Sequence, residues 1–103
     1  MNDRQLKDLL LGSVKLHILH HANRSPNFGQ ELRDELKRHG YEMSFGTLYS
    51  MFHSLVQQGY LKMTEQTVAG KIRKYYAITP KGRGVLTEGK LKAKELTAEL
   101  FES

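Results

Sequence analysis

The sequence contains no cysteine, no tryptophan and only two prolines among its 103 residues. Without cysteine, disulfides and thiolate chemistry are excluded. No apolar run approaches the roughly 20 residues that a membrane-spanning helix needs. Asp3 and Asp8 are out of place in a signal peptide. These absences predict a cytoplasmic protein without a membrane partner, and the length predicts a single domain with a modest core.

Acidic residues are almost missing from one long stretch of the chain. Glu65 is the only acid among the 45 residues from 43 to 87, and the same stretch carries six Lys or Arg. The other ten acids lie in residues 1–42 and 88–103. An ordinary soluble surface intersperses the two signs. One continuous segment is therefore almost free of negative charge, as the binding of a polyanion such as nucleic acid requires.

Hydrophobic spacing and capping residues predict the order of the secondary structure. Helices are expected at residues 5–21, 28–38, 45–58 and from 80 onward, and strands at 60–67 and 71–78. Ser44 and Thr79 are suited to cap the third and fourth helices. Three helices, a two-stranded ribbon and a helix make a mainly α winged helix-turn-helix. We expect residues 1–79 to form the DNA-binding part and residues 80–103 a dimerisation helix.

The third helix has a predicted buried stripe and an uncharged opposite face. The stripe comprises Phe45, Leu48, Phe52, Leu55 and Val56. The opposite face and its margins comprise Gly46, Thr47, Tyr49, Ser50, His53, Ser54 and Gln57. A merely solvated face carries Lys and Glu, whereas Ser, Thr and Gln can bond base edges or phosphates from within the major groove. The pattern predicts a DNA-reading helix; for His53, DNA contact and idle surface stay open.

The segment GKIRKYYAITPKGR, residues 70–83, holds five basic residues and no acid. With period 2, Ile72, Tyr76 and Ile78 are expected to face the core. Lys71, Arg73 and Lys74 are expected to hold phosphates, and Tyr75 to stack or bond a phosphate beside Arg73. The alternative is a hairpin whose solvated cations only protect a sheet edge. For Lys81 and Arg83, nearby phosphate and simple tolerance both stay open.

The last helix has the spacing of a dimerisation arm. Its apolar positions Leu86, Ala93, Leu96 and Leu100 keep a heptad-like repeat, and Leu11 and Ile18 widen the apolar surface of the first helix. Two-fold symmetry would then present two reader helices to a palindrome. The alternative is a helix folded back on its own domain.

Histidines provide the sequence's one metal-like spacing. His17 and His21 lie four residues apart on the first helix, with His20 between them. Such spacing can hold zinc, but no HExxH pattern and no cysteine completes a site, so core or interface histidines are favoured. No metal or cofactor is predicted. No catalytic arrangement stands out, and an enzyme is not expected.

Three ordered blocks resemble the signature of a known family. FGQELRDEL at 28–36, GTLYSMFHSLVQQGYL at 46–61 and GKIRKYYAITPKGR at 70–83 are similar to those of PadR transcriptional regulators. The length and single terminal helix resemble the family's shorter branch. Many members have proline where Ser50 stands and arginine at Ser54 and Ala77, so base contacts are expected to differ here.

The resemblance implies a homodimeric, sequence-specific DNA-binding regulator that acts as a repressor on a palindromic operator. It also implies a small-molecule effector between the subunits. Some relatives line such a cavity with an aromatic pair that includes tryptophan, which this chain lacks. Two other functions remain open: a winged-helix module that docks an acidic protein, and an architectural DNA-binding protein without a preferred sequence.

Overall fold

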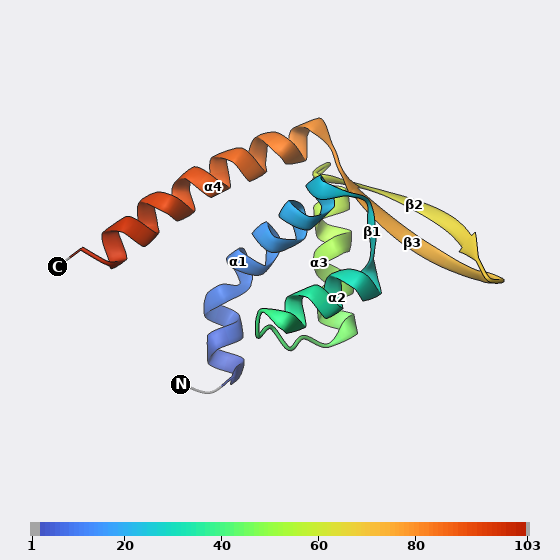
Figure 1. Ribbon diagram of the computed structural model, residues 1–103, viewed down its shortest axis with the longest axis horizontal. Coiled ribbons are helices and arrows are strands. Elements are labelled where there is room, and N and C mark those ends of the chain that lie inside the picture. Colours follow the sequence, from blue (N-terminus) through green and yellow to red (C-terminus); the bar gives the residue numbers. More distant parts are fainter. Residues whose placement is uncertain (1–2, 103) are drawn as a thin grey trace.

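The computed structural model describes the backbone of residues 3–102 and the side chains of residues 11–26 and 29–102 (Figure 1). Its elements follow in the order α1 (Asp3–Arg24), β1 (Asn27–Phe28), α2 (Gly29–Arg38), α3 (Phe45–Gln57), β2 (Leu61–Val68), β3 (Lys71–Ile78) and α4 (Pro80–Leu100). The predicted winged helix-turn-helix with a terminal helix is confirmed. Among the described residues, no helix combines the length and apolar character needed to cross a membrane.

The predicted helix caps are confirmed. The Ser44 side-chain oxygen accepts a hydrogen bond from the Thr47 amide at 3.1 Å and begins α3. The Thr79 hydroxyl oxygen accepts one from the Gly82 amide at 3.0 Å, and Pro80 follows in the first turn of α4. The Thr79 hydroxyl also donates to the carbonyl of Gly59 at 2.6 Å. The start of α4 is therefore fixed against the turn that ends α3.

The sheet has one strand more than the sequence predicted. Its order is β1-β3-β2, and all pairs are antiparallel. In β1, Asn27 pairs with Tyr76 and Phe28 with Tyr75. Phe28 thus belongs to a strand, and the prediction that it begins the second helix was wrong. Two residues are too few to display a strand periodicity, so only the partner strand identifies them.

The core lies between α1, α2, α3 and the base of the wing. Phe52 of α3 contacts Tyr76 of β3, with ring centroids 4.6 Å apart, and both side chains are buried as predicted. The other buried apolar residues are Val14, Ile18, Leu19, Ala22, Leu32, Leu36, Met43, Leu48, Met51, Leu55, Leu61 and Leu86. Each of the three helices contributes one apolar face, as a helix-turn-helix core requires.

Four residues expected in the core lie nearer the surface. Ile72 is 68% exposed because the far half of the β2–β3 hairpin extends beyond the helices, where neither of its faces meets the core (Figure 1). Phe45 is 45% exposed at the start of α3. Val56 and Ile78 are half-buried at the edge of the core. Periodicity identifies the face of an element, but it does not show how far the core extends along it.

The proposed dimer residues divide into two groups. Ile18 and Leu86 are 0% and 3% exposed and belong to the core of the single chain. They have almost no surface left to bury against a partner, so their assignment to the dimer interface is corrected. Leu86 reaches the core because the first half of α4 packs along α1 (Figure 1). Leu11, Ala93, Leu96 and Leu100 are exposed.

Candidate nucleic-acid interface

The outward face of α3 is exposed and uncharged. Leu48, Met51, Phe52 and Leu55 turn inward. Of the predicted reader residues, Ser54 is half-buried and the others are exposed: Gly46, Thr47, Tyr49, Ser50, His53 and Gln57. The structure thus brings all seven to one accessible surface. Their hydroxyl, imidazole and amide groups are able to donate to or accept from base edges and phosphates.

The start of α3 is organised by two hydroxyl groups. The Ser44 hydroxyl donates to the Thr47 hydroxyl oxygen at 2.9 Å and accepts from the Thr47 amide. No acidic residue occupies the first turn. The positive end of the helix dipole therefore remains uncompensated by a carboxylate and favours an anion such as phosphate.

The basic residues of the wing lie along β3. Lys71 is exposed at the hairpin tip, and Arg73, Lys74 and Tyr75 are half-buried. On the neighbouring strand, Glu65 lies opposite Lys74 in the strand register. The acid that interrupts the predicted acid-free segment thus lies beside one wing cation, Lys74, in the sheet.

Besides the buried contact of Phe52 with Tyr76, a polar contact joins the exposed face of the reader helix to the wing. Lys74 donates a hydrogen bond from its ammonium group to the hydroxyl oxygen of Tyr49, and this ammonium lies 4.8 Å from the centroid of the Tyr49 ring. The hydrogen bond raises the pKa of Lys74 above its ordinary value of 10.5, at which a lysine is already cationic at neutral pH. The sequence predicted both residues at the interface, but their contact spans 25 positions and leaves no local pattern.

Two further residues at this junction were not predicted from the sequence. The ring of Phe45 stacks on that of Tyr49 with centroids 6.4 Å apart, and the guanidinium of Arg33 lies 5.8 Å from the Phe45 centroid. The spacing of α3 predicted Phe45 in the core, and Arg33 resembles an ordinary surface cation of α2. A groove of about 250 Å³ separates α3 from β3 beside this stack. The row of Arg33, Phe45, Tyr49 and Lys74 forms one continuous cationic and aromatic surface.

Lys81 binds to the end of α3, and this contact explains why a basic residue stands in the first turn of α4. Its ammonium donates to the carbonyl of Gln58 at 2.9 Å and lies 5.3 Å from the centroid of the Tyr60 ring. Gln58 is the residue that ends α3. Lys81 therefore neutralises the negative end of that helix and supplies a donor to one of its last carbonyls.

Residues 18–88, from the C-terminal part of α1 to the first turns of α4, match the profile of the transcriptional regulator PadR-like family. The chain belongs to this family. As a PadR-like protein it is a DNA-binding transcriptional regulator and not an enzyme. The family profile covers all the elements from which the interface is built.

Individual relatives agree with the PadR-like assignment. A Mycobacterium tuberculosis protein named transcriptional regulator Rv3488 is 41% identical over 96 residues, which are 93% of this chain and 90% of the relative. The crystal structure of a PadR family regulator from Eggerthella lenta is 29% identical and superposes with a TM-score of 0.83, covering 94% of this chain and 86% of its own. A regulator from Clostridium thermocellum is 30% identical, with a TM-score of 0.78 over 90% of this chain and 93% of its own.

Three histidines of the PadR-like chain lie close together. His17 and His21 stack on one face of α1 with ring centroids 6.3 Å apart, and His39, which follows α2, brings its ring to 5.0 Å from His17. Burial lowers the pKa of His17 and of His21, and repulsion among the histidines lowers both further. His39 comes from a distant part of the sequence, so helical spacing gave no sign of it.

Proposed function

We propose that this chain is a homodimeric, sequence-specific repressor that inserts α3 into the major groove and rests its wing on the adjacent backbone. The observation that carries the proposal is the junction between α3 and the wing. There an uncharged, exposed helix face adjoins a cationic strand through the Lys74–Tyr49 contact. A helix of this kind fits a major groove about 12 Å wide.

The two halves of the surface would divide the work of recognition. Lys71, Arg73 and Lys74, with Tyr75 beside them, would hold phosphates and supply most of the affinity through counterion release. On α3, Ser50, His53 and Gln57 would reach base edges, where Gln suits adenine and Ser suits several bases. Gly46, Thr47, Tyr49 and Ser54 would allow close approach or contact the backbone.

The exposed leucines of α4 support a dimer. Leu96 and Leu100 are 56% and 70% exposed, and Leu91 and Phe101 near them are 61% and 85% exposed. So much apolar surface on one helix is costly in water and is buried by a second copy. Leu11 and Ala93 would join this interface. Two-fold symmetry would place the two copies of α3 in successive major grooves, about 34–36 Å apart, on a palindromic operator.

Repression is the regulatory mode that demands least of this surface. A dimer that occupies its operator excludes other proteins from that DNA without a further contact, whereas activation requires a second surface for the transcription machinery. A small-molecule effector would act by binding the DNA-competent dimer and the incompetent one unequally. These steps would take place in the cytoplasm, where the operator would be located.

Binding to genomic fragments across a range of salt concentrations tests this function. Fragments should include the region upstream of the protein's own gene, with random DNA of equal length as the control. A footprinted palindrome bound at least about 1,000-fold more tightly than random DNA is the expected result. Equal affinity for every fragment would favour an architectural DNA-binding protein instead. No DNA binding at all would favour a module that docks an acidic protein.

A further inference from the structure

Three histidines from different parts of the chain converge between α1 and the end of α2. His17 and His21 come from α1, and His39 comes from the turn after α2. One ring nitrogen of each lies within 4.8 Å of those of the other two. The Nε2 atom of His21 is shielded from solvent, whereas the His39 side chain is 48% exposed. Packing therefore holds His21 in place, whereas the His39 side chain has room to change its position.

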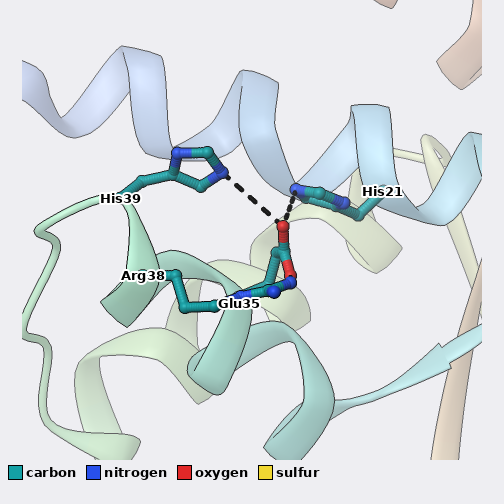
Figure 2. A network of polar contacts seen from close by, with 4 residues as sticks. All are labelled: His21, Glu35, Arg38 and His39. Atoms are coloured by element: carbon teal, nitrogen blue, oxygen red, sulfur yellow. Dashed lines mark ion pairs between the residues drawn. The ribbon is translucent and has the colours of Figure 1, made fainter.

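A carboxylate completes the group. The Oε1 atom of Glu35 lies 3.7 Å from Nε2 of His21 and 3.6 Å from Nε2 of His39, as Figure 2 shows. The other carboxylate oxygen pairs with the guanidinium of Arg38. Arg38 therefore orients Glu35 so that one oxygen is directed at the histidines, as outer residues orient the ligands of metal sites.

We propose that His17, His21, His39 and Glu35 bind a divalent transition metal of the zinc class. Three imidazoles and one carboxylate supply the four donors of a tetrahedral zinc site. Calcium and magnesium prefer sites built from oxygen atoms, and soft copper(I) prefers sulfur. The imidazole-rich donor set therefore suits divalent zinc, cobalt, nickel and copper, and a tetrahedral arrangement of the donors favours zinc.

Metal binding requires a small contraction of the cluster. Zinc–nitrogen bonds of 2.0–2.1 Å place neighbouring donors about 3.4 Å apart in tetrahedral geometry. The ring nitrogens are now up to 4.8 Å apart. His39 is able to close this gap because it is half-exposed and precedes Gly40, which has a φ of 87° and ends the helix.

The position of the site suggests what the metal would do. It would tie α1 to the connection between α2 and α3, and that connection ends at Ser44, the cap of the reader helix. Because α1 also packs against α4, the metal would stiffen the path between the dimer arm and α3. The metal would then act as the effector of DNA binding. This second step rests on the proposed function, whereas the metal site itself does not.

Cobalt(II) titration of untagged, metal-free protein tests the site without DNA. One equivalent per chain should produce the visible absorption bands of tetrahedral cobalt, and zinc should displace them. H39Q and E35Q should each weaken zinc binding more than about 10-fold. H20Q removes a neighbouring histidine outside the cluster and should bind as the wild type does. Far-ultraviolet circular dichroism of each variant verifies that it is folded.

Absence of the cobalt bands, or equal zinc affinity in the wild type, H39Q and E35Q, would overturn the metal site. The effector step is tested by measuring operator affinity with and without one equivalent of zinc. A zinc-dependent change of about fivefold or more that disappears in H39Q is expected. If zinc binds with the predicted ligands but operator affinity stays constant, the effector step is wrong and the metal site stands. If no operator is found, the proposed function fails, and the cobalt result is unaffected.

Discussion

The ammonium of Lys74 on β3 lies 4.8 Å above the ring of Tyr49 on α3 and donates a hydrogen bond to its hydroxyl. This contact links the two elements that the DNA-binding proposal assigns to different parts of the operator. A wing that is tied to the reader helix reaches the backbone at a fixed distance from the bases. Preorganisation of this kind reduces the entropy cost of binding.

The Lys74–Tyr49 pair should behave as a unit in DNA binding. Y49F removes the hydroxyl and K74A the ammonium, so each should weaken operator binding several-fold. Because both changes break the same contact, the double variant should be weakened by less than the product of the two single effects. Operator affinities of the four proteins form the cycle. K62A is the control for K74A, since Lys62 lies near the start of β2, opposite Ala77, and its effect should multiply with that of Y49F. A multiplicative result for K74A would contradict the linkage.

Arg73 should contribute affinity but no sequence preference. R73A should weaken binding to every sequence by a similar factor and flatten the dependence of log affinity on log salt by about 0.9 for each phosphate that the side chain neutralises. Filter binding on the operator and on random DNA at several salt concentrations measures both effects. K92A changes the same charge on α4, far from the wing, and should leave the salt slope unchanged. A change in base preference in R73A would show that the wing reads sequence.

The exposed leucines of α4 should hold the dimer together. L96D and L100D each place a charge in the expected apolar seam, and sedimentation equilibrium should detect monomers at concentrations where the wild type is dimeric. Both side chains are exposed in the single chain, so the fold should survive. E99Q alters a solvated position on the same helix and should remain a dimer. Dimers of unchanged stability in both aspartate variants would show that another surface joins the subunits.

The fold should depend on glycine at position 82, because the start of α4 lies very close there to the backbone of Tyr60. A Cβ atom at this position would lie 2.1 Å from the carbonyl oxygen of Tyr60 and 2.8 Å from Ile78. G82A should therefore lower the free energy of unfolding by about 1–3 kcal/mol. G84A is the matched control in the same helix, because its Cβ would meet nothing within 4 Å. It should stabilise the protein by about 0.5–1 kcal/mol, which urea unfolding measures. Equal effects would refute the close approach.

Features determined by local chemistry were predictable from the sequence. Ser44 and Thr79 cap their helices as expected, since a cap depends only on the next three residues. Gly82 is a close-packing position, whereas Gly84, two residues further along the same helix, faces open space. The difference depends on where the Tyr60 backbone passes, and no local pattern in the sequence contains that information.

Features determined by tertiary contacts were not predictable. The alternation of residues along β3 predicts that Ile72 faces the core, but the hairpin extends beyond the core at that point. The reader face of α3 was predicted from its missing charges, whereas Arg33 and Phe45 join it through contacts between α2 and α3. The meeting of His39 with His17 and His21 likewise depends on how α2 packs against α1. Each of these features depends on segments that are too far apart in the sequence for helix or strand periodicity to relate them.

The histidine cluster should make the metal-free protein less stable in mild acid. Burial and the neighbouring histidines hold the pKa of His17 and of His21 in the folded protein below the ordinary value of 6.5. As the pH falls through about 6.5, His17 and His21 take up protons in the unfolded chain but not yet in the folded chain. The free energy of unfolding therefore declines until the pH reaches the folded pKa values. Above about pH 7 both states are neutral, and stability should be constant.

The surroundings of the cluster determine how steep this decline is. The carboxylate of Glu35 on α2 favours protonation of His21, whereas His20, Arg24 and His39 oppose it. Urea unfolding in EDTA between pH 7.5 and about 5.5 should show a stability that declines with acidification in the wild type and declines less in H17Q. H53Q removes an exposed histidine of α3 and should retain the full decline. A wild type that gains stability as the pH falls would mean that Glu35 outweighs burial and repulsion, which reverses the sign argued from the lowered pKa values.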